Sequence, residues 1–193
     1  MLGKQAKILS DRQIKMVLIY LSGTRRPVRN RVIFLLSIKS GLRAKEIASL
    51  RWSMVLTASG EVCDEIALES VASKGDSGRR IPMNRQLRAA LVELRDHDCE
   101  GHQEYVVKSE RSPKMSAQSV VNLFQRWYQD VGLVGCSSHS GRRTFITNLS
   151  RNITQVGGSL RDVQMLAGHK NLQTTQRYIE HDAESQRKVV DLI

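Results

Sequence analysis

The sequence predicts a mostly α-helical domain with a small three-stranded antiparallel β-sheet, an α+β fold. Apolar residues recur at helical spacing through most of the chain, whereas residues 52–83 instead carry short runs typical of strands with turn residues between them. No internal repeat, low-complexity tract or flexible linker divides the 193 residues. We therefore expect one domain over residues 1–193.

Signals for helix starts and ends place the individual elements. Ser10 and Gln13 have the spacing of a capping box, so the first helix is expected at 11–22. Pro27 suits the first position of a second helix, which is apolar nearly all round and should end near Gly41. A third helix is expected at 43–50 and strands at 52–57, 62–68 and 79–83. Further helices are expected at about 84–97, 116–130, 138–150 (capped by Ser138), 159–167, 171–181 and 183–192.

Charge and composition narrow the class of partner. The formal net charge is +11, and a basic surface attracts polyanions regardless of their sequence. No apolar run approaches the roughly 18 residues of a membrane span, and the first ten residues lack the apolar core of a signal peptide. The three cysteines are far apart and read as reduced thiols. These features predict a cytoplasmic protein whose partner is nucleic acid rather than a membrane.

A basic stretch lies at the expected start of the second helix. It contains Arg25, Arg26, Arg29 and Arg31 and no acidic residue, although the helix dipole disfavours positive charge at this end. We interpret these side chains as contacts to DNA phosphates. The further candidates are Arg79, Arg80, Lys108, Arg111 and Lys114. The alternative is a basic face that only aids solubility.

Two other arginines fall on apolar helix stripes. Arg43 shares a face with Ile47 and Leu50, and Arg142 likewise lines up with Phe145 and Leu149. Buried guanidinium groups need an anionic partner, so an anion is expected between the two arginines, with Glu46 holding one side of Arg43. Internal salt bridges or arginine stems that reach out to water would give the same pattern.

Three more residues complete a pattern of chemically active side chains. His139 lies three residues before Arg142, so the two side chains should converge on one helix face. His169 follows a helix that ends at Gly168, and Tyr178 lies two turns into the next helix. Singly these signals are weak, because such a tyrosine usually packs in a core and such a histidine usually caps a helix.

Taken together, the residues resemble the tyrosine recombinases, or phage-type integrases, over nearly the whole chain. The segment Gly41 to Trp52 is similar to the family's first arginine box, and Lys74, in the turn before Ile81-Pro82, to its β-hairpin lysine. His139 to Arg142 matches the H-x-x-R box, and Leu166 to His169 with Tyr178 matches the final box. The six catalytic positions that the resemblance implies, in the family's order, are Arg43, Lys74, His139, Arg142, His169 and Tyr178.

The resemblance implies the catalytic-domain fold of these enzymes and a site-specific DNA recombinase. Tyr178 would attack a backbone phosphate to form a 3′-phosphotyrosine, while Arg43, Arg142 and His169 donate to the non-bridging oxygens. His139 would orient groups or move protons, and Lys74 would protonate the leaving oxygen. No metal, cofactor or ATP is expected. The alternatives are a type IB topoisomerase-like enzyme and a non-catalytic DNA-binding or regulatory protein on the same fold.

The sequence departs from the family pattern in places. Gly141 stands where leucine is usual and Arg143 where histidine is common, and no N-terminal core-binding domain is evident before residue 11. The chain is therefore expected to be either a fragment or a single-domain member similar to the fimbrial-switch recombinases, of bacterial, phage or mobile-element origin. The family also implies a homotetramer on double-stranded DNA, formed through the C-terminal helix; packing of that helix on its own domain is the alternative.

One possible metal site remains in the sequence. His97, Cys99 and His102 lie close together and could all ligate zinc, but no fourth ligand is evident. We expect a solvated loop there instead.

Overall fold

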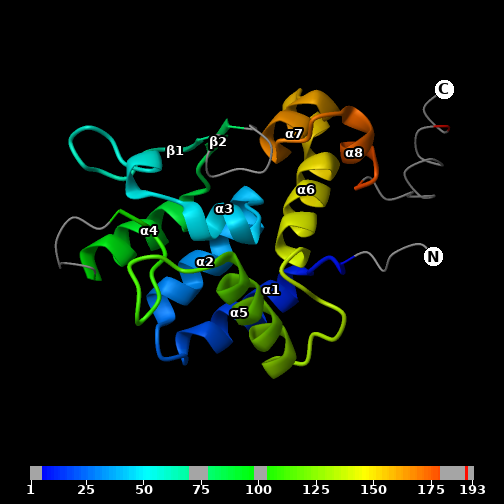
Figure 1. Ribbon diagram of the computed structural model, residues 1–193. Helices are drawn as coiled ribbons and strands as arrows, with labels where there is room; N and C mark the ends of the chain where they lie inside the picture. The colour runs from blue at the N-terminus through cyan, green and yellow to red at the C-terminus, as the bar shows by residue number, and fades with distance from the viewer. Residues whose placement is uncertain (1–5, 70–77, 98–103, 179–189, 191–193) are drawn as a thin grey trace.

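The computed structural model describes residues 6–69, 78–97, 104–178 and 190 of the chain, and it is mostly helical (Figure 1). The helices are α1 (Asp11–Ser22), α2 (Pro27–Ser40), α3 (Ala44–Ser49), α4 (Arg85–His97), α5 (Ala117–Asp130), α6 (Ser140–Asn152), α7 (Leu160–Ala167) and α8 (Leu172–Gln176). Two 3₁₀ turns, η1 (Trp52–Met54) and η3 (Ile153–Val156), and two strands, β1 (Glu65–Leu68) and β2 (Arg79–Pro82), complete the described elements. The predicted fold class, helical with a small antiparallel sheet, is confirmed.

The expected helix boundaries are confirmed where local signals were strong. The Ser10 side chain accepts from the Gln13 backbone, and the Gln13 side chain accepts in return, which closes the capping box of α1. Pro27 opens α2, and Gly41 ends it in the left-handed conformation with φ 64°.

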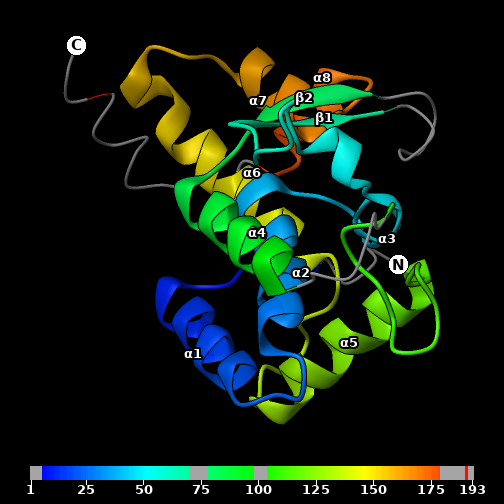
Figure 2. The same cartoon turned by 90° about the vertical axis from the view of Figure 1, so that its left-hand side faces the viewer.

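Helix α2 lies at the centre of the core. Its residues from Val32 to Leu36 are fully buried, and it packs against α1, α4 and α6. In the side view, α4 lies on the near side of α2 and α1 below it (Figure 2). A second, smaller core, built on Ile146, Val163 and Ala167, joins α6 to α7. Helix α6 contacts α2 of the main core and carries Ile146 of the second core, so it connects the two cores.

The sheet has two strands among the described residues, where three were expected. β1 and β2 are antiparallel, with Glu65 opposite Pro82 and Leu68 opposite Arg79. The strand expected at 52–57 is wrong: Trp52–Met54 form the 3₁₀ turn η1, and Leu56 makes a single bridge to Val62. Met54 and Val55 are consecutive and both buried, and neighbouring residues of a strand would point to opposite faces.

Two further helix predictions differ from the structure. Ser138 does not cap α6. The helix begins at Ser140 with His139 at the N-cap position, and the His139 side chain makes no capping hydrogen bond. The helix expected at 171–181 is described only as α8, with Tyr178 in the turn that follows it. Of the last expected helix, at 183–192, every residue except Val190 lies outside the described residues. None of the described helices has the length and apolar character needed to span a bilayer.

Candidate active site

Arg142 is buried at the junction of α2, α6 and α7. Its side chain donates from Nη1 to the carbonyl oxygen of Gly41 at 2.6 Å and from Nη2 to that of Ala167 at 2.7 Å. Both acceptors lie at helix ends, where carbonyl groups lack intrahelical partners. Burial lowers the pKa of Arg142, and the nearby Arg43 lowers that pKa further. Two of its five N–H donors thus have partners among the described residues, and the others can serve an anion.

Glu46 organises the other two arginines. Its side chain is 1% exposed and accepts from Arg43 Nη1 at 2.9 Å and from both terminal nitrogens of Arg79 at 3.1 Å. Burial alone would raise the pKa of Glu46, but the hydrogen bonds from Arg79 and Arg43 outweigh it and hold the pKa below its ordinary value. Glu46 therefore remains charged and keeps both guanidinium groups in place.

Arg79, predicted as a contact to DNA, lies inside the site. Its side chain is only 6% exposed and its Nε donates to the carbonyl oxygen of Leu166 at 3.0 Å. It thus links β2 to α3 and to the end of α7. A contact of Arg79 with DNA stays a prediction. One sequence signal for the burial of Arg79 is its place at the start of the second strand, opposite the buried Leu68 of β1. Its partner Glu46 could not be predicted, because it lies 33 positions away in the chain.

His169 follows α7, which ends at the left-handed Gly168 with φ 64°. Its Nδ1 lies 2.9 Å from Oγ1 of Thr175, and its ring stacks on Tyr178 with centroids 5.4 Å apart and planes inclined by 26°. Burial lowers the pKa of His169 to about 4, and Arg142, Arg43 and Arg79 add to this effect. The imidazole is therefore neutral at pH 7.

Tyr178 lies in the turn after α8. Its backbone oxygen accepts from Thr147 Oγ1 at 3.3 Å, which ties this turn to α6. Its side chain lines a cavity of about 280 Å³ together with His139, Arg143, Thr174 and Arg177. The structure thus places Tyr178 between the stacked His169 ring and a basic cavity that also contains His139.

The described part of the site has a positive net charge. Arg43, Arg79 and Arg142 carry three positive charges and Glu46 one negative charge, which leaves a net charge of +2 around the neutral His169. Such a cluster attracts an anion. Five of the six predicted catalytic residues, Arg43, His139, Arg142, His169 and Tyr178, lie on the elements that meet here. Lys74 lies outside the described residues.

Three of the four predicted DNA-contacting arginines at the start of α2 have acidic partners from other segments. Arg25 and Arg26 approach Glu110 at 3.2 and 3.8 Å, and Arg31 pairs with Glu93 at 3.0 Å. Arg29 is half-buried and donates to the carbonyl oxygen of Lys108 at 3.2 Å. Together with Lys108 and Arg111, the residues Arg25, Arg26 and Arg29 line a cavity of about 630 Å³.

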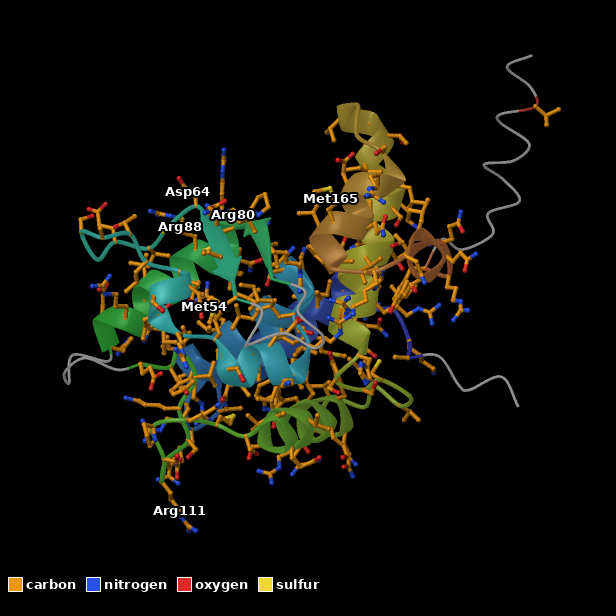
Figure 3. The ribbon with its side chains drawn as sticks, turned by 45° about the horizontal axis from the view of Figure 1, so that its top comes forward. Met54, Asp64, Arg80, Arg88, Arg111 and Met165 are labelled. Carbon is orange, nitrogen blue, oxygen red and sulfur yellow. The ribbon has the colours of Figure 1, made fainter. Side chains whose placement is uncertain are left out.

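Arg80 and Arg111 lie at opposite ends of the molecule (Figure 3). Arg80 is exposed on β2 and pairs with Glu65, whereas Arg111 projects from the far end of the molecule (Figure 3). The Lys114 ammonium group lies over the Tyr105 ring, 4.8 Å from its centroid. Five of the basic candidates therefore share one cavity, and neither Arg80 nor Lys114 is among its lining residues.

The candidate zinc ligands are only partly described. His97 is exposed at the end of α4, and Cys99 and His102 lie outside the described residues. Within residues 6–69, 78–97 and 104–178, no three His, Cys, Asp or Glu side chains are grouped as a metal site.

Known proteins resemble this chain in sequence and in fold. The chain is 32% identical over 189 residues to the tyrosine recombinase XerA of Thermococcus onnurineus (strain NA1), covering 94% of this chain and 61% of that protein. It is 31% identical over 169 residues to the tyrosine recombinase XerC of Shewanella oneidensis, covering 85% and 51%. The chain thus spans about half to three fifths of the length of these relatives.

Solved structures share the fold at lower identity. A crystal structure of XerA recombinase superposes with a TM-score of 0.76 at 20% identity, covering 100% of this chain and 65% of that one. The XerH site-specific recombinase bound to its difH substrate superposes with a TM-score of 0.71 at 18% identity, covering 98% and 55%. The phage integrase family matches residues 7–185, nearly the whole chain. From this match and the sequence identities, the chain belongs to the phage integrase family.

Proposed function

We propose that this chain cuts and rejoins DNA strands at specific sites, with Tyr178 as the nucleophile. The observation that carries the proposal is the cluster of three guanidinium groups around Glu46, next to a tyrosine stacked on a neutral histidine. A phosphodiester carries one negative charge, and attack by an oxygen nucleophile adds a second in the transition state. The net charge of +2 in the site complements that second charge. It therefore stabilises the transition state more than the bound substrate, and this difference is what accelerates the reaction.

The residues divide the reaction between them. Oη of Tyr178 forms a bond to phosphorus while the bond from phosphorus to the 5′ oxygen breaks, leaving a 3′-phosphotyrosine and a 5′ hydroxyl. His139, in the same cavity as Tyr178, takes the tyrosine proton. Arg43, Arg142 and Nε2–H of His169 donate to the non-bridging oxygens. The phosphotyrosine keeps the bond energy, so rejoining needs no ATP, and the arginines supply the charge that a metal ion would otherwise provide.

Lys74 is proposed as the general acid. The leaving 5′ alkoxide is strongly basic and needs a proton, and an arginine hardly releases one. Lys74 precedes β2 in the chain by only five positions, and β2 begins with Arg79, which is bonded inside the site. This short connection is consistent with a lysine that reaches the same phosphate.

Double-stranded DNA is the proposed substrate, in a cytoplasmic setting. The XerH recombinase that shares this fold was solved bound to difH DNA, and a lambda integrase with the same fold was solved as a dimer bound to a core site. The basic residues at the start of α2 and the exposed Arg80 are proposed phosphate contacts outside the catalytic cluster. Assembly into a tetramer on DNA through residues 183–192 is proposed on the family resemblance.

A suicide substrate tests the proposal. A duplex of a candidate site, nicked near the scissile phosphate, loses a short fragment after cleavage and traps the covalent complex. The wild-type protein should give an adduct that resists denaturant, and Tyr178→Phe should give none while binding the duplex with similar affinity. Tyr20→Phe, whose hydroxyl pairs with Asp130 on α5, is the matched control and should still form the adduct.

The same assays separate the alternatives. Binding of DNA by the wild type without any adduct would favour a non-catalytic DNA-binding protein. Relaxation of supercoiled plasmids of unrelated sequence would favour a type IB topoisomerase-like enzyme. An adduct that persists in Tyr178→Phe would refute the assignment of the nucleophile.

A further inference from the structure

Thr175 lies on α8, fully buried, with its hydroxyl oxygen 2.9 Å from Nδ1 of His169. We propose that Thr175 is a positioning residue: its hydroxyl donates to Nδ1 and so fixes the imidazole in the tautomer whose proton is on Nε2. Nε2–H is then the group presented to an anion in the site. The inference rests on the proposed function only in taking that anion to be the scissile phosphate.

The tautomer matters because the imidazole is neutral. Burial and the surrounding Arg142, Arg43 and Arg79 lower the pKa of His169 to about 4. A neutral imidazole has one N–H donor and one lone pair, and the partner of one nitrogen decides what the other presents. A proton on Nδ1 would turn a lone pair on Nε2 toward the phosphate oxygens, which repel it.

The burial of Thr175 decides the direction of the hydrogen bond. Within the described residues, Nδ1 of His169 is the partner of the Thr175 hydroxyl oxygen. If this oxygen accepted from Nδ1–H, its own hydrogen would be left without an acceptor in a fully buried place, which is unfavourable. If the hydroxyl donates, its hydrogen and the Nδ1 lone pair are both satisfied.

Other contacts hold the His169 backbone and one face of its ring. They keep the protonated nitrogen in one position as well as in one tautomer. The His169 backbone N donates to the Gln164 oxygen at 3.1 Å, and Gln164 Nε2 donates to the His169 oxygen at 2.9 Å. Tyr178 covers one face of the ring. With Nδ1 engaged by Thr175 on α8, Nε2 is the ring nitrogen that has no hydrogen-bond partner among the described residues, and it is left for a ligand.

Nitrogen-15 NMR of the histidine rings tests the tautomer directly, in the full chain without DNA. In the wild type at pH 7, the His169 signals, assigned by their loss in His169→Asn, should show a protonated Nε2 and an unprotonated Nδ1. Thr175→Ser keeps the hydroxyl and should keep this pattern, whereas Thr175→Val keeps the shape and should give a mixture of tautomers. A protonated Nδ1 in the wild type, or an unchanged pattern in Thr175→Val, would overturn the inference.

Thr144→Val is the matched control. Thr144 on α6 is also fully buried, and its hydroxyl donates to the Ser140 oxygen at 2.8 Å and accepts from the Leu9 backbone N at 2.9 Å, so its partners are other than His169. This variant should lower the melting temperature and leave the His169 pattern unchanged. A change in the His169 pattern of Thr144→Val would show that the NMR signal reports general loosening rather than the loss of one hydroxyl.

Cleavage kinetics then test the consequence. On the nicked substrate, Thr175→Val should cleave roughly tenfold more slowly than wild type, since only part of its molecules present the donor, and Thr175→Ser should be close to wild type. In a His169→Ala background, Thr175→Val should cause no further loss. Further slowing there would show that Thr175 does not act through His169. If the wild type forms no adduct at all, the proposed function fails, while the NMR result still decides the tautomer.

Discussion

Removing the charge of Glu46 is the sharpest perturbation that the site offers. Glu46→Gln keeps the volume of the side chain but places an amide, with its own N–H donors, among the donors of Arg43 and Arg79. The carboxylate is 1% exposed and accepts four hydrogen bonds: from the Arg43 backbone N at 2.8 Å, Arg43 Nη1 at 2.9 Å and the two Arg79 nitrogens at 3.1 Å. Arg79 is 6% exposed and cannot turn to water when its partner is lost.

The expected cost follows from this burial. Breaking a buried ion pair by removing one partner costs about 3 to 5 kcal/mol. For a chain of this length each kcal/mol lowers the melting temperature by about 2 to 4 °C, so the loss should be roughly 6 to 20 °C. The control is Glu93→Gln, since Glu93 pairs with Arg31 at 3.0 Å on the surface and such pairs contribute only about 0 to 1 kcal/mol.

The effect of Glu46→Gln should also depend on pH. The pKa of Glu46 lies below its ordinary value of 4.5 in the folded protein. Its stabilisation is therefore fully present above that ordinary value and is lost as the pH falls through the folded-state pKa. Urea unfolding followed by circular dichroism at pH 7 and at lower pH measures this. The reasoning is refuted if Glu46→Gln costs no more than Glu93→Gln at pH 7, or if the cost stays constant on acidification.

Three other outcomes are expected. Gly141→Ala should lower the free energy of unfolding by about 1 to 3 kcal/mol, because a Cβ there would clash with the Ser37 hydroxyl oxygen. Ser37→Ala should recover part of the loss in thermal melts, and full tolerance of Gly141→Ala would contradict this close packing. His169 has a pKa of about 4 in the folded protein against 6.5 in the unfolded chain. Acidification from pH 6.5 to 4 should therefore lower the free energy of unfolding of the wild type by about 1 to 2 kcal/mol more than that of His169→Asn, a figure reduced for the partial exposure of the ring. Equal losses in both proteins would count against the low pKa. Lys74→Ala should fail on normal DNA but cleave a substrate with a bridging 5′ sulfur at close to the wild-type rate, since a thiol with a pKa of about 8.5 leaves without a proton. Arg43→Ala should be defective on both substrates, and a failure of sulfur to rescue Lys74→Ala would mean that another residue is the acid.

Local sequence signals determined most of the helix boundaries. The capping box at Ser10, the proline that opens α2 and the glycine that ends it act within about four residues, so their outcome is readable without knowledge of the rest of the chain. The strand expected at 52–57 failed for the opposite reason. Its residues have strand propensity, but the burial of both Met54 and Val55 is set by distant segments that pack over them.

The candidate catalytic residues could be named from the sequence because their spacing along helices and after helix ends carries the family resemblance. The partners of these residues could not be named, since spacing gives no information about contacts between distant segments. The bond of Arg142 to Gly41 spans 101 positions and that of Arg79 to Leu166 spans 87. The bonds of Arg79 inside the site were therefore not predicted, whereas the pairing of Glu46 with Arg43, three positions away, was.

The sequence by itself determined the fold class, the order of the helices and the set of reactive side chains, because capping, periodicity and motif spacing are local properties of the chain. Only the tertiary structure decided which guanidinium groups share Glu46, why His169 is neutral and which hydroxyl meets its ring. Charge balance, pKa and proton position depend on burial and on neighbours from other segments, and these exist only once α3, β2, α6 and α7 are packed together.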